Sequence, residues 1–260
     1  MRESNRNRAD RHSPEEFGTV VVGRNPVMEL LKSGREIEKL YVQRGEREGS
    51  ITKIFAEARK RSIVISEVDK KRLDELALGN AHQGVAAVAS AVSFVSVSDI
   101  VSAARDKGEK PLIVVCDGIE DPHNLGAIIR SADGAGAHGI VISRRHCPVI
   151  GQTVFKSSAG AAAHVPIARV ANIASAVDEL KESGVWVFAA EADGTCYTEA
   201  DFDCACAVVL GSEGDGISRL VREKCDFTVS IPMYGRVNSL NVSAAAAVLL
   251  FHAAQKQRKL

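Results

Sequence analysis

The first half of the chain alternates short β-branched runs with amphipathic stretches. Runs rich in valine, isoleucine and tyrosine suit a half-buried pleated surface and predict strands at Thr19–Val22, Leu40–Val42, Ile63–Ile65 and Gly84–Val88. The stretches between them repeat apolar residues at helical spacing, which predicts helices over Pro26–Lys32, Ser50–Arg61 and Lys70–Leu76. Residues 17–95 are therefore predicted to form a small α/β domain.

The second half changes to more continuous apolar runs separated by helical segments. Such runs are typical of strands buried on both faces in a parallel sheet, because the crossover helices cover both sides. They lie at Leu112–Cys116, Gly139–Ile142, Val185–Phe188, Ala207–Leu210 and Phe227–Ile231. Residues 111–260 thus predict a second α/β domain, with a mostly parallel sheet between helices.

Two segments fall outside these patterns. Residues 1–16 are charged and polar with almost no apolar side chain, so burial cannot offset the entropy of ordering them, and a disordered tail is predicted. Residues 96–110 carry a helical pattern that stops at Lys107-Gly108 and are expected to form the linker. The junction between the two domains is placed near Ser93 to Ser98.

The composition indicates the cellular compartment and the state of the cysteines. No apolar run approaches the ~20 residues of a membrane span, and the charged start differs from a signal peptide, so a cytoplasmic protein without a membrane partner is expected. The six cysteines lack zinc-site spacing, which predicts reduced thiols and no metal. Cys204 and Cys206 are interpreted as neighbours on one strand face, with half of a metal site as the alternative.

The charge distribution argues against a simple polybasic nucleic-acid binder, because the net charge is zero. Residues 17–95 carry 13 lysines and arginines against 10 acidic residues, whereas residues 96–260 carry 16 against 19. Any phosphate-binding surface is therefore expected to be assembled locally, with the first domain contributing to it.

The polar segment Asp117–Gly136 follows the first buried strand of the second domain. Ligands of open α/β sheets bind at the carboxyl ends of strands, and Asn124 lies there at the start of a helix that carries Arg130. Taken alone, however, Asn124 suits a helix cap and Arg130 a surface charge. Gly134 and Gly136 end this helix rather than open it, which excludes a dinucleotide-binding loop.

Two further polar loops follow buried strands. Segment 211–216 holds three glycines and Glu213, so its backbone can approach a ligand closely. Glu213 alone is either a carboxylate at a helix start or a site residue. Segment 231–243 runs into an alanine-rich helix, where Ser239 alone suits a cap. That helix, with alanine at 244–247, needs a close neighbour, which is either the sheet or a partner subunit.

Together the three segments are similar to the three motifs of the SpoU/TrmH family of RNA 2′-O-ribose methyltransferases. The motifs read DPHNLGAIIRSADGAG, LGSEGDGI and IPMYGRVNSLNVSAAAA, in this order, and the resemblance covers about residues 111–257. It implies a SPOUT fold, in which the parallel sheet ends in a trefoil knot. More loosely, Gly23–Val27 and His82–Gly84 resemble the substrate-binding domain of the bacterial branch that methylates a 23S rRNA guanosine.

The resemblance also implies a cofactor, partners and roles. S-adenosylmethionine is expected in the knot, against Gly211, Ile231 and Leu240. Arg130 is assigned to the attacking ribose hydroxyl and its neighbouring phosphate, and the catalytic polar shell consists of Asn124, Glu213, Ser239 and Asn241. The expected partners are RNA and a second copy of the chain, in a homodimer, without DNA.

The substrate leaves alternatives open. The first interpretation is ribose methylation of a guanosine in 23S rRNA, because the N-terminal module resembles the substrate-binding domain of that branch. A tRNA enzyme is a rival within the same class. An RNA-binding assembly factor or antibiotic-resistance protein of the same fold is a third reading, and the intact polar set Asn124, Arg130, Glu213, Ser239 and Asn241 argues against an inactive enzyme.

Overall fold

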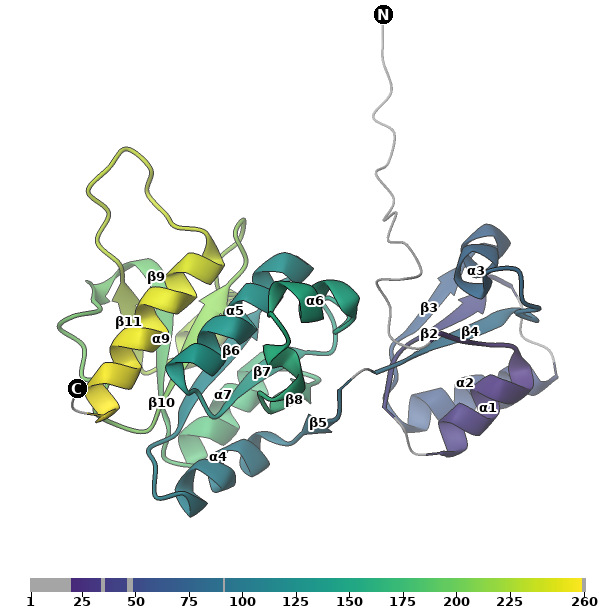
Figure 1. Cartoon of the computed structure of the whole chain (residues 1–260), viewed down its shortest axis with the longest axis horizontal. Coiled ribbons are helices and arrows are strands. Elements are labelled where there is room, and N and C mark those ends of the chain that lie inside the picture. The colour runs from purple at the N-terminus through teal and green to yellow at the C-terminus, as the bar shows by residue number, and fades with distance from the viewer. Residues whose placement is uncertain (1–19, 34–35, 46–48, 91, 259–260) are drawn as a thin grey trace, which may run out of the picture. The chain divides into compact units, whose positions relative to one another are not determined.

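The chain divides into two compact units, with the boundary between Ala91 and Val92. The computed structural model describes residues 20–33, 36–45, 49–90 and 92–258, and the expected tail over residues 1–16 lies outside them. Both units are α/β, as the apolar patterns predict, and each is shown in Figure 1.

The first unit is a four-stranded sheet with helices on both faces. Its strands β1 (Val20–Val22), β2 (Ile37–Gln43), β3 (Ile65–Val68) and β4 (Val85–Ala89) lie in the order β1-β4-β2-β3. β4 runs antiparallel to β1 and β2, whereas β3 is parallel to β2. α1 (Arg24–Lys32) and α2 (Ser50–Lys60) pack on one face through Leu30, Leu31 and Ile54, and α3 (Lys70–Ala77) packs on the other.

The start of α1 contacts the loop before β4 in this unit. The backbone N–H of Arg24 donates to Gln83 Oε1 at 3.0 Å, and Arg24 Nε donates to the carbonyl of Gln83 at 2.9 Å. Arg24 belongs to the segment Gly23–Val27 and Gln83 to His82–Gly84. The two short motifs noted in the sequence therefore form one structural feature.

The second unit is built on a seven-stranded parallel sheet with the order β11-β9-β10-β6-β7-β8-β5. Every described strand pair in it is parallel. Five strands match the predicted runs: β6 (Leu112–Asp117), β7 (Gly139–Ser143), β9 (Trp186–Cys196), β10 (Cys206–Gly211) and β11 (Phe227–Ser230). β5 (Phe94–Val95) and β8 (Ile167–Val170) extend the sheet beyond the prediction.

Helices cover both faces of this sheet, because alternate side chains of its strands are apolar on each side. One core lies under α5 (Pro122–Ala135), α6 (Gln152–Ser157) and α9 (Val242–Arg258) and includes Val114, Ile140 and Val208. The opposite core lies under α4 (Val97–Asp106), α7 (Ile173–Glu182) and α8 (Arg219–Lys224) and includes Val115 and Val209. A short 3-10 helix spans Ala161–Ala163.

The expected linker over residues 96–110 is part of the second unit instead. β5 pairs with β8, and α4 buries Val97, Ile100, Val101 and Ala104 in the second core. Ser96 caps α4 by accepting from the N–H of Asp99 at 3.0 Å, and the Asp99 carboxylate accepts from the N–H of Ser96. The junction therefore lies a few residues earlier than the sequence pattern placed it.

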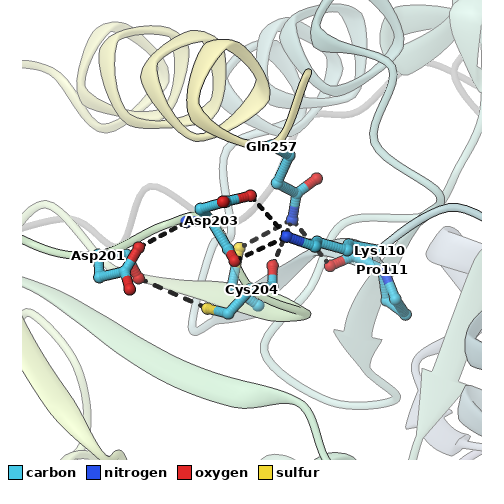
Figure 2. A network of polar contacts seen from close by, with 7 residues as sticks. Lys110, Pro111, Asp201, Asp203, Cys204 and Gln257 are labelled. Carbon is cyan, nitrogen blue, oxygen red and sulfur yellow. Dashed lines mark hydrogen bonds and ion pairs between the residues drawn. The ribbon is translucent and has the colours of Figure 1, made fainter. Parts of the chain in front are cut away.

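The far end of α9 is tied to the amino-terminal edge of the sheet, as Figure 2 shows. Gln257 Nε2 donates to the carbonyls of Cys204 and Pro111, at 2.7 and 3.2 Å. Lys110 Nζ donates to the Asp203 carbonyl at 2.9 Å and forms an ion pair with its carboxylate. Cys206 is the first residue of β10, Cys204 precedes it, and both are free thiols. These bonds anchor the helix whose opposite end carries Asn241.

Close packing of α5 against its neighbours gives a test of the core under α5, α6 and α9. A Cβ on Gly126 would lie 2.9 Å from the Val154 carbonyl oxygen and 2.8 Å from Ser157 Cβ, both in α6, whereas a Cβ on Gly134 would meet only the exposed ring of Phe251, at 3.3 Å. Gly126→Ala should therefore lower the free energy of unfolding by about 1–3 kcal/mol. Gly134→Ala should change it by less than about 1 kcal/mol. Urea unfolding of both variants measures the difference, and equal stabilities would contradict this packing.

Candidate active site

Three polar side chains from distant parts of the sequence meet at the carboxyl edge of the second sheet. Asn124 in α5 donates from Nδ2 to Glu213 Oε1 at 3.1 Å. Asn241, just before α9, donates from Nδ2 to the same oxygen at 2.6 Å and to Asn124 Oδ1 at 3.0 Å. These three residues, termed the polar triad below, bring the three sequence motifs into contact.

Asn124 is free to join the triad because another residue caps its helix. The Asp121 carboxylate accepts from the N–H groups of His123 and Asn124, at 3.2 and 3.1 Å, and Pro122 occupies the first helical turn. The interpretation of Asn124 as a plain cap is therefore wrong. Gly136 ends α5 in a left-handed conformation, as its position in the sequence predicts.

Asn241 both caps α9 and joins the triad. Its Oδ1 accepts from the N–H of Ser243 at 2.9 Å and from the Ser243 hydroxyl at 2.6 Å, so the amide is oriented with Nδ2 toward Glu213. Ser239 does not cap this helix; it lies two residues earlier, exposed in the loop over residues 231–241. The sequence placed the cap near the right position but on the wrong side chain.

Glu213 lies at the tip of a tight turn after β10. The N–H of Ser212 donates to the carbonyl of Gly216 and the reverse bond also forms, both at 3.0 Å. Gly211 lies directly beneath this turn, where a Cβ would come within 2.1 Å of the Gly216 carbonyl carbon. Glycine at 211 therefore allows the turn to fold back on its strand and hold Glu213 against Asn124.

Two carboxylates that the sequence interpretation did not single out hold the far side of this turn. Glu191 Oε1 accepts from the N–H of Ile217 at 3.1 Å, and Asp117 Oδ2 accepts from the N–H of Ser218 at 2.8 Å. Both follow buried strand residues at the carboxyl edge of the sheet. This position after a buried strand is the feature of the sequence that could have pointed to the two carboxylates. It does not specify which backbone group each carboxylate binds.

A hollow of about 580 Å³ opens beside the triad, within the ~300–1,000 Å³ typical of small-molecule sites. Its lining includes all three residues expected to contact the cofactor, Gly211, Ile231 and Leu240. Glu213, Ser239 and Asn241 also line it, so it combines an apolar side with polar groups. A nucleoside with a charged amino-acid tail matches this combination, and the hollow is termed the cofactor hollow below.

Arg130 lies apart from the triad. Asn124 and Arg130 are six residues apart in α5, so their side chains point about 120° apart around the helix and lie about 9 Å apart along its axis. Arg130 is exposed, lines neither the cofactor hollow nor the neighbouring hollow that includes Asn124, and has no hydrogen bond or ion pair within the described residues. One chain thus brings Asn124, Glu213, Ser239 and Asn241 together, but not Arg130.

Other classes of site find no support among the described residues. No group of three or more His, Cys, Asp and Glu side chains there could hold a metal ion. No helix in the same part of the chain is long and apolar enough to cross a membrane.

Family models match most of both units. The SpoU rRNA Methylase family matches residues 111–251, and the domain described as RNA 2′-O ribose methyltransferase substrate binding matches residues 20–95. A protein of Staphylococcus haemolyticus named as a TrmH family tRNA/rRNA methyltransferase is 44% identical over 93% of this chain and 97% of its own. The similarly named YacO of Bacillus subtilis is 42% identical over 91% and 95%.

Solved structures agree with the fold. The SpoU methyltransferase AviRb of Streptomyces viridochromogenes, solved with the cofactor AdoMet, is similar with a TM-score of 0.59 and 25% identity over 93% of this chain and 91% of its own. An AdoMet-bound rRNA methyltransferase of Sinorhizobium meliloti gives a TM-score of 0.57 and 25% identity over 94% and 87%. With its three motifs joined in one site, this chain belongs to the SpoU/TrmH family of S-adenosylmethionine-dependent RNA 2′-O-ribose methyltransferases.

Proposed function

We propose that the chain methylates the ribose 2′-hydroxyl of a guanosine in 23S rRNA, in the cytoplasm. The polar triad at the edge of the cofactor hollow carries this proposal, because it places hydrogen-bonding groups beside the space where the methyl donor fits. The substrate-binding match over residues 20–95 supports the ribosomal substrate, as does the likeness of Gly23–Val27 and His82–Gly84, which contact each other, to the 23S rRNA branch.

S-adenosylmethionine fits the cofactor hollow in size and chemistry. Ile231 and Leu240 offer an apolar slot for the adenine, and the absent side chain of Gly211 leaves its backbone accessible. When bound, the cofactor supplies an electrophilic methyl group on a sulfonium. We further propose that the loop over residues 231–241 and α9 complete the trefoil knot implied by the family.

The triad residues are proposed to align the acceptor ribose. Both amides hold Glu213 through Oε1, and Oε2 has no partner within the described residues, so it remains available to a hydroxyl. Ser239 lines the same hollow and can donate a further hydrogen bond. Much of the rate enhancement then comes from positioning a weak nucleophile in line with the methyl group.

Arg130 is proposed to act from a second copy of the chain, in a homodimer. Its exposed guanidinium, which lines neither hollow of its own chain, can reach a neighbouring site and bind the 2′-oxygen and the adjacent phosphate. Because a guanidinium stays protonated, the hydroxyl proton passes to phosphate or water. The alanine-rich helix α9 does not support the dimer, because its neighbours lie within the same chain. Ala246 and Ala253 are buried in the core that α9 shares with α5.

A tRNA substrate is the second candidate, because relatives that are 44% and 42% identical in sequence are named tRNA/rRNA methyltransferases. Mapping ribose methylation in rRNA and tRNA from strains with and without the gene distinguishes the two. Loss of one 2′-O-methylguanosine from 23S rRNA is expected. Loss of a tRNA methylation instead would replace the ribosomal assignment.

Removing the first unit should separate RNA recognition from cofactor binding. A chain starting at Val92 keeps β5 and α4, which belong to the second unit. It should bind S-adenosylmethionine within about twofold of the full chain but lose rRNA methylation, since the matched substrate-binding domain is gone. Calorimetry and a methyl-transfer assay measure the two properties. Full transfer activity in the shortened chain would exclude the first unit from substrate selection.

A further inference from the structure

A second hollow, of about 690 Å³, lies at the carboxyl ends of β10, β6, β7 and β8. β6 leads to β7 and β8 on one side of the sheet, whereas β9 and β10 lie on the other, so the strand order reverses between β6 and β10. Open α/β sheets bind ligands at such a reversal point. The turn over residues 212–216 and Val242 line both hollows, so the second one, termed the switch-point hollow, adjoins the cofactor hollow.

The walls of the switch-point hollow suit a planar, partly apolar ligand. Ile119, Ile173 and Val221 line it and are buried among the apolar residues of the unit. Glu120 and His146 pair at 3.0 Å, from the loops after β6 and β7. Both side chains are largely exposed, at 67% and 77%, so this pair forms the rim rather than the interior.

Asp117 is a carboxylate that the fold orients in this hollow and that keeps one oxygen without a partner among the described residues. It ends β6, pairs in register with Gly211 of the cofactor hollow, and is half-buried. Its Oδ2 accepts from the N–H of Ser218, while Oδ1 has no partner within the described residues. A fixed carboxylate with one open oxygen therefore lies one strand away from the cofactor hollow.

Asn172 supplies an oriented donor to the same hollow. Its Oδ1 caps α7 by accepting from the N–H of Ser175 at 3.1 Å, which turns Nδ2 outward. That nitrogen has no partner within the part of the chain described, and the exposed Arg145 adds a cation nearby. The hollow thus offers an acceptor, a neutral donor and a positive charge.

We propose that the switch-point hollow binds the base of the acceptor nucleotide and selects guanine. Among the four bases, guanine presents two adjacent donors on its Watson–Crick edge, N1–H and the 2-amino group. Asp117 accepts one of them at Oδ1 and the other at the second lone pair of Oδ2. Asn172 Nδ2 donates to O6, and Arg145 binds backbone phosphate. The shared turn then places the attached ribose beside Glu213. This inference rests on the proposed function and adds the residue that reads the base.

Inosine, which lacks the 2-amino group, tests the proposal without altering the protein. RNA carrying inosine at the mapped target position should be methylated by the wild-type chain with a kcat/KM roughly 10- to 100-fold lower than guanosine RNA. The variant Asp117→Asn should have a kcat/KM on guanosine RNA that is lower than the wild-type value by a similar factor. On inosine RNA its kcat/KM should be close to that of the wild-type chain. Its affinity for S-adenosylmethionine should be unchanged. This non-additivity is the signature of a direct contact.

Glu120→Gln is the matched control, because its carboxylate lines the same hollow but already pairs with His146. It should keep the wild-type ratio between guanosine and inosine RNA. Equal methylation of both RNAs by the wild-type chain would overturn the base assignment, as would an unchanged ratio in Asp117→Asn. Methylation of a different nucleoside's ribose would also overturn it while leaving the proposed chemistry intact, whereas no transfer to any RNA would refute the proposed function itself.

Discussion

Arg130→Ala is expected to lower methyl transfer roughly 10²- to 10⁴-fold, the scale for losing a positioned group that stabilises a transition state. S-adenosylmethionine affinity should remain unchanged, because Arg130 does not line the cofactor hollow. Single-turnover transfer to rRNA and calorimetric cofactor binding measure the two effects. Wild-type activity in this variant would remove Arg130 from the reaction.

Mixed dimers determine from which subunit Arg130 acts. If it acts on the partner's site, random mixing of inactive Arg130→Ala and Glu213→Gln chains should restore about a quarter of the wild-type activity, since half of the dimers are mixed and each has one intact site. If each arginine serves its own chain, every site carries one defect and no activity returns. A strictly monomeric chain at micromolar concentration would also contradict the dimer.

Gly211→Ala is expected to weaken S-adenosylmethionine binding by roughly 10- to 100-fold, the loss of affinity that corresponds to an overpacking strain of about 1–3 kcal/mol. The added Cβ would come within 2.2 Å of the backbone nitrogen of Ile217, which cannot move aside as a flexible side chain could. The turn must then open and carry Glu213 away from Asn124 and Asn241. Calorimetry measures the affinity, and thermal unfolding shows whether the rest of the chain stays folded.

Gly214→Ala is the control within the same turn, because a Cβ there meets no atom within 4 Å. Near-normal cofactor affinity is expected for it. Equal affinities in the two variants would mean that close approach at Gly211 does not shape the hollow.

The fold was predictable where burial of an element produces a simple pattern of apolar residues in the sequence. Central strands such as β6 and β10 are covered on both faces and appear as unbroken apolar runs. β8 was missed because it is short, follows Pro166 and contains Arg169. Periodicity predicted the helix that ends near Lys107, but it cannot tell which sheet a helix packs against, so the linker was placed in a segment that belongs to the second unit.

The site was predictable only from the combination of motifs. Asn124 and Glu213 are 89 residues apart, and Asn124 and Asn241 are 117 apart, so no local spacing reveals their contact. Taken singly, each resembled a cap or a surface charge, and the true caps are Asp121 and Asn241. Asp117 and Glu191 escaped notice because a carboxylate that accepts from a distant loop N–H leaves no sequence spacing to detect.

The identity of the methylated product tests the proposed guanosine substrate in 23S rRNA. The purified chain is incubated with radiolabelled S-adenosylmethionine and unmodified 23S rRNA, and the RNA is digested to nucleosides and separated by mass. Label is expected in 2′-O-methylguanosine, with none when Glu213→Gln replaces the wild-type chain. Label on a base, or no label in the 23S rRNA, would contradict the proposed function.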